Sequence, residues 1–192
     1  VCQRIETAGS LRRKNPVVNN INFVAAAADE ERFISALRQI PGAMQAVKNS
    51  AQCIVLRLEN GTPLYFHLTG AGEFAAALFL QTGSASHIAA LKSLEPEAAV
   101  FAARSGAEGA DLDSEQEIYN ALGMALIPPE AREGRGEIEI AQEARRAGGV
   151  FPELVHESDI CGIIHAHTTY SDGLNTLEEL ARAVHARGYQ YL

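Results

Sequence analysis

The sequence predicts an α+β fold: a mixed or antiparallel sheet with helices, then a small α/β region, then the first β-α unit of a parallel α/β barrel. Three observations predict this order. Alternating apolar side chains indicate strands over 20–28, 54–58 and 64–68. Helical periods of apolar residues lie between and after these strands. Near the C-terminus, a strand-like run over 161–167 precedes a capped helix, which is typical of the start of a βαβ unit.

The N-terminal half is expected to fold as strand, helix, hairpin and two short helices. Residues 29–39 keep a helical period after the first strand. Asn60-Gly61 between two apolar runs is a strong signal for a two-residue hairpin turn. An alanine-rich helix over 73–80 and a second short helix over 85–92 follow.

The composition indicates a soluble globular protein with one ordinary domain or pieces of two or three. The chain has 192 residues, of which 47% are hydrophobic. No signal sequence and no membrane-spanning apolar run is visible, so we expect a cytoplasmic location and no membrane partner. Cys2, Cys53 and Cys161 have neither zinc nor disulfide spacing, which fits a reducing compartment. Because the chain does not begin with methionine, we expect a fragment.

The formal net charge of −8 argues against a protein that coats nucleic acid generally, but the charge is uneven. Residues 1–92 carry a net charge of +3, residues 93–158 carry −9 and residues 159–192 carry −2. A surface that attracts phosphate is therefore expected in the first segment alone, around the basic run of residues 12–14. The alternative interpretation is a basic turn that is simply solvated.

A glycine-serine turn with two arginines precedes a strand that presents two amides on one face. The turn comprises Gly9, Ser10, Leu11, Arg12 and Arg13. Asn20 and Asn22 share a face of the following strand, because side chains alternate along a strand. Such an arrangement is suited to holding a triphosphate beside a pair of metal ligands. The ligands, however, are amides instead of carboxylates.

This pattern resembles the palm of the family X DNA polymerases, in which Gly-Ser-x-Arg-Arg is followed by Gly-Asp-x-Asp. The resemblance implies phosphate or nucleotide binding by Gly9, Ser10, Arg12 and Arg13. It also implies DNA, gapped or at its ends, and a dNTP as partners of a nucleotidyltransferase. The family's two metal-binding aspartates fall on Asn20 and Asn22, and its third carboxylate falls on Tyr65. Two amides and a phenol in place of three carboxylates argue against a magnesium site at the palm.

Two later runs match the same family. Thr82, Gly83 and Ser84 are similar to its turn beside the nucleotide sugar, which implies a nucleotide-binding role for them. A capping box at 114–117, followed by a Pro-Pro break and a glycine-rich loop, resembles the thumb in its bacterial form. The helices expected from these signals and from a second capping box span 115–122, the region near 137–146 and the residues after Thr176.

The most specific chemical motif is His165-Ala166-His167, followed by Asp172 and Gly173. Histidines two apart on a strand point the same way, and Asp172 on the next loop is placed to turn back as a hard ligand. Alone, such a pair is more often exposed or hydrogen-bonded than bound to metal. The full run resembles the first motif of the PHP (polymerase and histidinol phosphatase) metallophosphoesterases. This implies divalent metal ions (Mn, Zn or Mg) at His165, His167 and Asp172, with further ligands on later strands.

We therefore expect a palm over 1–92 that lacks its N-terminal part, a thumb over 93–150, a linker over 151–158 and the truncated start of a PHP domain over 159–192. The expected function is part of a DNA polymerase X-like DNA-repair protein that binds DNA or nucleotide but has lost nucleotidyl transfer in the palm. Metal-dependent 3′–5′ exonuclease or phosphoesterase activity would belong to the PHP domain of the parent protein. The alternative is a non-catalytic DNA-end or nucleotide-binding scaffold. A histidinol-type phosphatase would leave the palm and thumb motifs unexplained.

Overall fold

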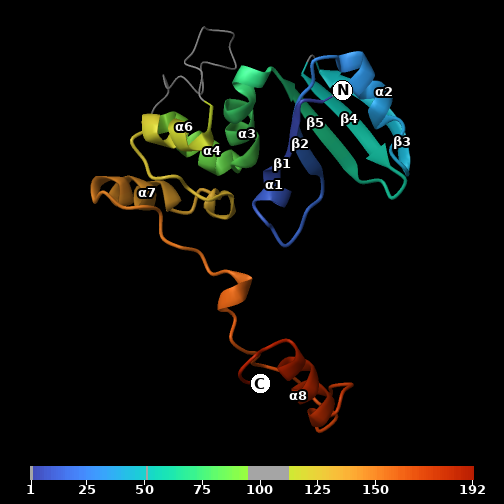
Figure 1. Cartoon of the computed structure of the whole chain (residues 1–192), viewed down its shortest axis with the longest axis vertical. Coiled ribbons are helices and arrows are strands. Elements are labelled where there is room, and N and C mark those ends of the chain that lie inside the picture. The colour runs from blue at the N-terminus through green and yellow to red at the C-terminus, as the bar shows by residue number, and fades with distance from the viewer. Residues whose placement is uncertain (1, 51, 95–112) are drawn as a thin grey trace. The chain divides into compact units, whose positions relative to one another are not determined.

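The structure is a computed structural model that describes residues 2–50, 52–94 and 113–192 (Figure 1). It divides into two compact units, Val1–Phe151 and Pro152–Leu192, which we call the N-terminal and C-terminal units. Part of the predicted thumb, over 95–112, lies outside the described residues. The division between palm and thumb within the N-terminal unit stays a prediction.

A five-stranded mixed sheet forms the first part of the N-terminal unit. Its strands are β1 (Arg4–Ala8), β2 (Ile21–Ala26), β3 (Ala43–Ser50), β4 (Cys53–Leu58) and β5 (Pro63–Thr69). Their order is β1-β2-β5-β4-β3, in which β2 and β5 are parallel and the other neighbouring pairs are antiparallel. The predicted mixed sheet and the hairpin around Asn60-Gly61 are therefore confirmed. The predicted two-residue turn is wrong, because Leu58 N donates to the carbonyl of Thr62 at 3.0 Å and the loop spans residues 59–61. The sequence signals missed β1 and β3.

The register of β2 with its two neighbours assembles the polar end of the sheet. Parallel pairing sets Asn22 opposite Tyr65 on β5, and antiparallel pairing sets Asn22 opposite Ala8 on β1. Since β1 ends at Ala8, the chain enters the single helical turn α1 (Gly9–Arg12) directly beside Asn22. The Gly-Ser turn and the two amides are thus neighbours in space as well as in sequence.

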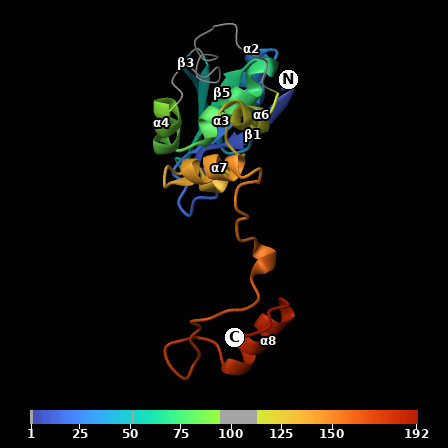
Figure 2. The ribbon, with the colours of Figure 1, turned by 90° about the vertical axis from the view of Figure 1, so that its left-hand side faces the viewer.

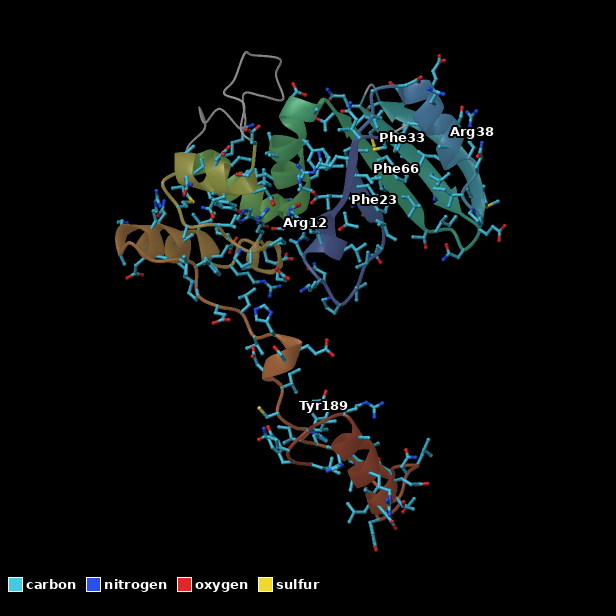
Figure 3. The ribbon with its side chains drawn as sticks, viewed as in Figure 1. Arg12, Phe23, Phe33, Arg38, Phe66 and Tyr189 are labelled. Atoms are coloured by element: carbon cyan, nitrogen blue, oxygen red, sulfur yellow. The ribbon has the colours of Figure 1, made fainter. Side chains whose placement is uncertain are left out.

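Two helices cover opposite faces of the sheet. Helix α2 (Glu30–Leu37) buries Phe33 among the apolar side chains of one face, where Phe66 stacks on Phe23 with ring centroids 5.0 Å apart (Figure 3). Helix α3 (Phe74–Thr82), entered through the 3₁₀ turn η1 (Ala71–Glu73), packs Phe74 against Val24 on the other face. Because Val24 and Asn22 are two residues apart on β2, the polar end of the strand lies on the α3 side of the sheet.

A second group of helices packs around the far side of α3. They are α4 (Ala85–Leu94), α6 (Glu115–Ala121), the 3₁₀ turn η3 (Pro129–Ala131) and α7 (Glu137–Arg146). Figures 1 and 2 both place α6 and α7 next to α3, and their shared core includes Phe79, Leu91, Tyr119 and Ile138. The helices predicted over 73–80, 85–92, 115–122 and near 137–146 are confirmed. In the described part of the chain no single helix has the length and hydropathy of a membrane span, although Ala71–Thr82 and Ala85–Leu94 reach them as a pair bent by 114°.

The C-terminal unit contains the 3₁₀ turn η4 (Glu157–Asp159) and helix α8 (Leu177–Ala186). The predicted capping box of α8 is confirmed, because Thr176 Oγ1 accepts from Glu179 N at 3.2 Å and Glu179 Oε2 accepts from Thr176 N at 2.7 Å. The predicted strand over 161–167 is wrong. The described residues form one parallel bridge there, between Gly162 and Tyr191, and the positive φ of His165 (59°) interrupts the extended backbone.

Candidate functional site

A linear series of hydrogen bonds occupies the polar end of β2. The Nδ2 group of Asn22 donates to Asn20 Oδ1 at 2.7 Å, and the Nε2 atom of His67 lies 3.1 Å from Asn22 Oδ1. An amide oxygen can only accept, so Nε2 of His67 is the donor in this contact. The amide of Asn22 is therefore held at both its nitrogen and its oxygen, by two groups that are not carboxylates.

His67 is a member of this group that the sequence motifs did not indicate. The signal was present, because His67 shares its face of β5 with Tyr65. Tyr65 is half-buried opposite Asn22, at the position predicted for the third metal ligand. Magnesium requires hard oxygen ligands, usually with carboxylates among them. Two amides, an imidazole and a phenol do not fit the two-metal centre that the family motif implies.

Gly9 allows the α1 turn to approach the amide of Asn22. Its φ of +61° lies in the left-handed region, and a Cβ atom built on it would lie 2.8 Å from Asn22 Nδ2. Both the backbone conformation and the space therefore require glycine. Ser10, the next residue of the predicted phosphate turn, is half-buried in the same helical turn.

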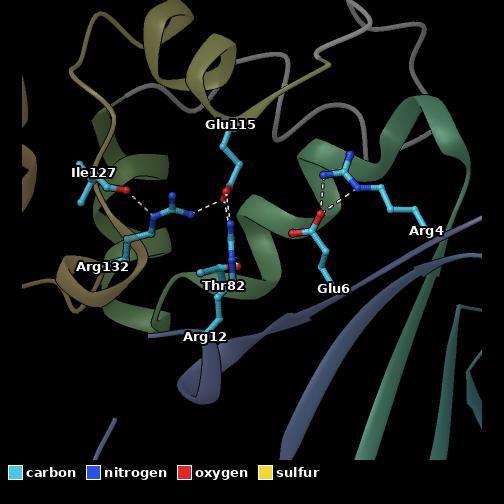
Figure 4. Close-up of polar contacts among 7 residues, drawn as sticks. All are labelled: Arg4, Glu6, Arg12, Thr82, Glu115, Ile127 and Arg132. Atoms are coloured by element: carbon cyan, nitrogen blue, oxygen red, sulfur yellow. Dashed lines mark hydrogen bonds and ion pairs between the residues drawn. The ribbon is translucent and has the colours of Figure 1, made fainter. Parts of the chain in front are cut away.

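Arg12 points from α1 to the N-terminus of α6, where it binds Glu115 through two nitrogens (Figure 4). Its Nη1 group lies 3.0 Å from Glu115 Oε1 and donates to Thr82 Oγ1 at 2.7 Å, while Nη2 donates to Glu115 Oε2 at 2.6 Å. The buried Arg132 also donates to Glu115 Oε1, and its Nε group donates to the carbonyl of Ile127 at 2.9 Å. Burial alone would raise the pKa of Glu115, but the two guanidinium groups outweigh it and hold the pKa below its ordinary value.

The next two cations of the basic run are also paired with carboxylates. Arg13 donates from Nε to Glu133 Oε1 at 2.6 Å and from Nη1 to the carbonyl of Thr82 at 2.7 Å. Lys14 Nζ lies 2.8 Å from Glu130 Oε1, and this hydrogen bond raises the pKa of Lys14. The three cations predicted to attract phosphate thus each contact an acidic residue of the later, acidic segment.

The predicted nucleotide turn is an integral part of the same assembly. Thr82 is fully buried and accepts from both arginines through its hydroxyl and its carbonyl. Gly83 has no room for a Cβ atom, which would lie 2.8 Å from side-chain atoms of His87 and Ile88. Ser84 Oγ accepts from the backbone N–H of His87 at 3.1 Å and so caps α4. The structure brings Thr82 to Arg12 and Arg13 and places Gly83 and Ser84 in the adjoining turn.

Three buried polar side chains, His87, Tyr119 and Glu137, are hydrogen-bonded to one another next to the turn of Gly83 and Ser84. His87 Nδ1 lies 2.6 Å from Glu137 Oε1, and His87 Nε2 lies 3.2 Å from the hydroxyl of Tyr119. Burial lowers the pKa of His87 despite the neighbouring carboxylate. A neutral His87 therefore donates from Nδ1 to Glu137 and accepts from Tyr119 through Nε2.

In the C-terminal unit the loop after the histidine pair folds back on itself. His167 Nδ1 lies 2.6 Å from Asp172 Oδ1, and the ring centroids of His165 and His167 are 5.3 Å apart. A Cβ atom on Gly173 would lie 2.3 Å from the carbonyl oxygen of His167, which explains why glycine follows the aspartate. Asp172 thus bonds to the ring of His167. The described residues of the chain contain no group of three or more His, Cys, Asp or Glu side chains arranged to hold a metal ion.

Comparison with known proteins finds a curated relative and similar solved structures. The DNA polymerase/3′-5′ exonuclease PolX of Bacillus subtilis (strain 168) is 28% identical over 197 residues, which cover 98% of this chain and 33% of the relative. The chain therefore spans about a third of the length of that curated relative. The crystal structure of Leishmania infantum polymerase beta, a ternary P/T complex, matches with a TM-score of 0.54 and 14% identity over 67% of each chain. No model of a protein family matches the chain.

The two comparisons bear on different properties of the chain. At 14% identity the solved structure shows the fold alone, and its fold agrees with the mixed sheet and helices of this chain. The bacterial relative aligns with nearly the whole sequence. The resemblance to the family X DNA polymerases that the motifs indicate is thereby confirmed.

Proposed function

We propose that the chain is part of a DNA polymerase X-like DNA-repair protein that binds gapped DNA or DNA ends, together with a dNTP, but does not carry out nucleotidyl transfer in its palm. The observation that carries the proposal is the hydrogen-bonded chain of Asn20, Asn22 and His67 at the place of the family's metal-binding carboxylates. The names of the bacterial polymerase and exonuclease and of the P/T complex support DNA as the partner. A cytoplasmic location and the absence of a membrane partner belong to the same proposal.

The chemistry of phosphoryl transfer explains why these substitutions matter. Two-metal enzymes place cations on both the attacking and the leaving oxygen, and the protein's task is to hold those cations with anionic ligands. Asn22 already satisfies its amide within the series of hydrogen bonds, and Asn20 and Tyr65 offer an amide and a phenol in place of carboxylates. Loss of such ligands is expected to lower the rate of nucleotidyl transfer by orders of magnitude, and each tenfold loss corresponds to about 1.4 kcal/mol of activation barrier.

Primer extension by the full-length protein on gapped DNA, with Mg²⁺ or Mn²⁺, tests the proposal. We expect no template-directed synthesis, while the anisotropy of labelled gapped DNA reports binding that weakens with salt. The Asn20→Ala/Asn22→Ala variant is the control. Robust synthesis by the wild-type protein that this variant abolishes would refute the proposal of an inactive palm.

A second candidate function, metal-dependent 3′–5′ exonuclease or other phosphoesterase activity, is supported by the contact between His167 and Asp172. His165, His167 and Asp172 are the residues that would hold a divalent metal ion (Mn, Zn or Mg) together with further ligands, and such an ion would supply Lewis-acid activation of a phosphate ester. The chain's own contribution is to orient the ring of His167. Asp172 holds this ring through Nδ1, so Nε2 is the ring nitrogen that would bind the metal ion.

Digestion of 5′-labelled DNA by the full-length protein, with and without a chelator, tests this second function. The expected result is metal-dependent shortening from the 3′ end that the His165→Ala/His167→Ala variant loses and the Asn20→Ala/Asn22→Ala variant keeps. DNA binding without shortening or synthesis would instead favour the non-catalytic DNA-end or nucleotide-binding scaffold.

A further inference from the structure

The side chain of Arg13, to which the sequence motif assigns phosphate binding, is already paired with the carboxylate of Glu133. The Nε group of Arg13 donates to Glu133 Oε1 at 2.6 Å. A guanidinium offers five N–H donors, and this contact together with the bond to the Thr82 carbonyl uses two of them. A charge-assisted hydrogen bond of this length is stronger than one between neutral groups, so an incoming anion must compete with the carboxylate of Glu133 for Arg13.

The backbone on both sides of Glu133 is fixed by buried contacts. The preceding residue, Arg132, is buried, and its carbonyl accepts from Ser84 N at 3.0 Å. The following residue, Gly134, lies so close to α4 that a Cβ atom would stand 2.6 Å from Cβ of Ser86. Its N–H group donates to the buried Glu137 at 2.7 Å. Glu133 is therefore presented to Arg13 by a rigid loop, unlike a surface ion pair between two mobile side chains.

The three ion pairs of the basic run differ in how readily an anion could replace the carboxylate. Glu115 lies between Arg12 and Arg132, and its removal would leave two largely buried cations. Lys14 is 74% exposed and already reaches solvent. Among the described residues, Glu133 contacts one guanidinium and its side chain is 22% exposed, while that of Arg13 is 10% exposed. Displacement of Glu133 is therefore the step that would make a buried guanidinium available.

We propose that Glu133 is an affinity-determining residue that competes with the phosphate groups of a nucleotide for Arg13. A triphosphate then binds at the α1 turn when its oxygens replace the Glu133 carboxylate, which moves toward solvent. This inference rests on the proposed function, because it takes a polyphosphate as the ligand of the turn. It goes beyond that function by assigning an opposing role to a residue outside the Gly-Ser-x-Arg-Arg motif.

Titration calorimetry with tripolyphosphate at constant ionic strength tests this role in the full-length protein. The Glu133→Gln variant keeps the size of the side chain and removes its charge, so we expect it to bind about 5- to 20-fold more tightly than the wild type. Glu130→Gln, which removes the carboxylate of the exposed Lys14 pair, is the matched control and should change the affinity by less than about twofold. In Arg13→Gln/Glu133→Gln the gain should disappear.

Equal affinities of the wild type and Glu133→Gln, or an equal gain in Glu130→Gln, would overturn the inference in favour of a general charge effect. Glu133→Asp provides a second test if Glu133→Gln unfolds, because the shorter carboxylate also releases Arg13 and should tighten binding. Gapped DNA lacking a terminal phosphate is assayed in parallel by anisotropy. Failure of every variant to bind tripolyphosphate overturns this inference, whereas failure to bind the DNA overturns the proposed function.

Discussion

Arg12 and Glu115, 103 residues apart in the sequence, are joined by hydrogen bonds of 3.0 and 2.6 Å that use both carboxylate oxygens. Glu115 is also bound by the buried Arg132, so two guanidinium groups share one carboxylate. This relationship ties the helical turn after β1 to the N-terminus of α6. Glu115 is therefore a direct polar link between α1 and α6.

Glu115→Ala is expected to destabilise the N-terminal unit by about 3–5 kcal/mol, because it leaves two cations unpaired in a largely buried position. Urea denaturation followed by circular dichroism measures this loss of unfolding free energy. Glu6→Gln, which breaks the exposed pair of Glu6 with Arg4, is the control and should cost no more than about 1 kcal/mol. A comparable effect of both substitutions would show that the Glu115 pair is an ordinary surface contact.

Folding stability should decrease as the pH falls below the ordinary pKa of histidine, 6.5, because burial holds the pKa of His87 below that value. The unfolded chain then binds a proton that the folded protein excludes, so this contribution to stability is present above pH 6.5 and is lost on acidification. Urea midpoints measured from about pH 8 to about pH 5 follow the loss. His87→Gln should remove the decrease in this range, while substitution of the exposed His185 by glutamine should leave it unchanged.

A second, more acidic loss of stability is expected from two carboxylates. The pKa values of Glu115 and Glu137 lie below the ordinary value of 4.5, because their hydrogen bonds to cations, His87 and backbone N–H groups outweigh burial. Their stabilising contribution is present above pH 4.5 and is lost as the pH falls through the folded-state values. Circular dichroism during acid titration should show Glu137→Gln unfolding over a wider pH range than the wild type, because one fewer carboxylate takes up a proton on unfolding.

Local sequence signals predicted much of this fold, because they report local physics. The hairpin at Asn60-Gly61 and the helix starts at Ser114 and Thr176 depend on turn and capping residues that a sequence displays directly. Strand β1 was not predicted because its apolar alternation is weak. It is an exposed edge strand on which Arg4 and Glu6 form an ion pair with each other. The strand expected over 161–167 does not form, because the described residues offer this backbone a single β-bridge partner, Tyr191.

The sequence predicted most residues of the candidate site but not the side chains that they contact. Asn22 and Tyr65 are neighbours, as the motif positions imply, because β2 and β5 pair in parallel. The ion pairs of Arg12 and Arg13 with Glu115 and Glu133 join residues more than a hundred positions apart, and no local pattern reports them. His67 carried a signal in its alternation with Tyr65, but the contact with Asn22 depends on the register of two strands.

Gly9→Ala should destabilise the protein more than Gly61→Ala, although both glycines have a positive φ. At each position alanine costs about 1–2 kcal/mol for the left-handed backbone. At Gly9 the new methyl group also meets the Asn22 amide, whereas no atom lies within 4 Å of the corresponding position at Gly61. We expect the difference in unfolding free energy to reach about 1 kcal/mol or more. Equal losses would mean that the α1 turn moves away from Asn22 without cost.

The charge of the side chains at the end of β2 and β5 should decide whether the palm binds a divalent cation. Asn20→Asp, Asn22→Asp and Tyr65→Asp together place three carboxylates where the wild type has two amides and a phenol, and carboxylate oxygens are preferred ligands of Mg²⁺ and Mn²⁺. The restored variant should bind Mn²⁺ at least about tenfold more tightly than its parent, as measured by the loss of the free Mn²⁺ signal in electron paramagnetic resonance. Both proteins should carry His165→Ala and His167→Ala, so that the C-terminal unit does not contribute. Equal Mn²⁺ binding would mean that the chain of Asn20, Asn22 and His67 is not what excludes the metal.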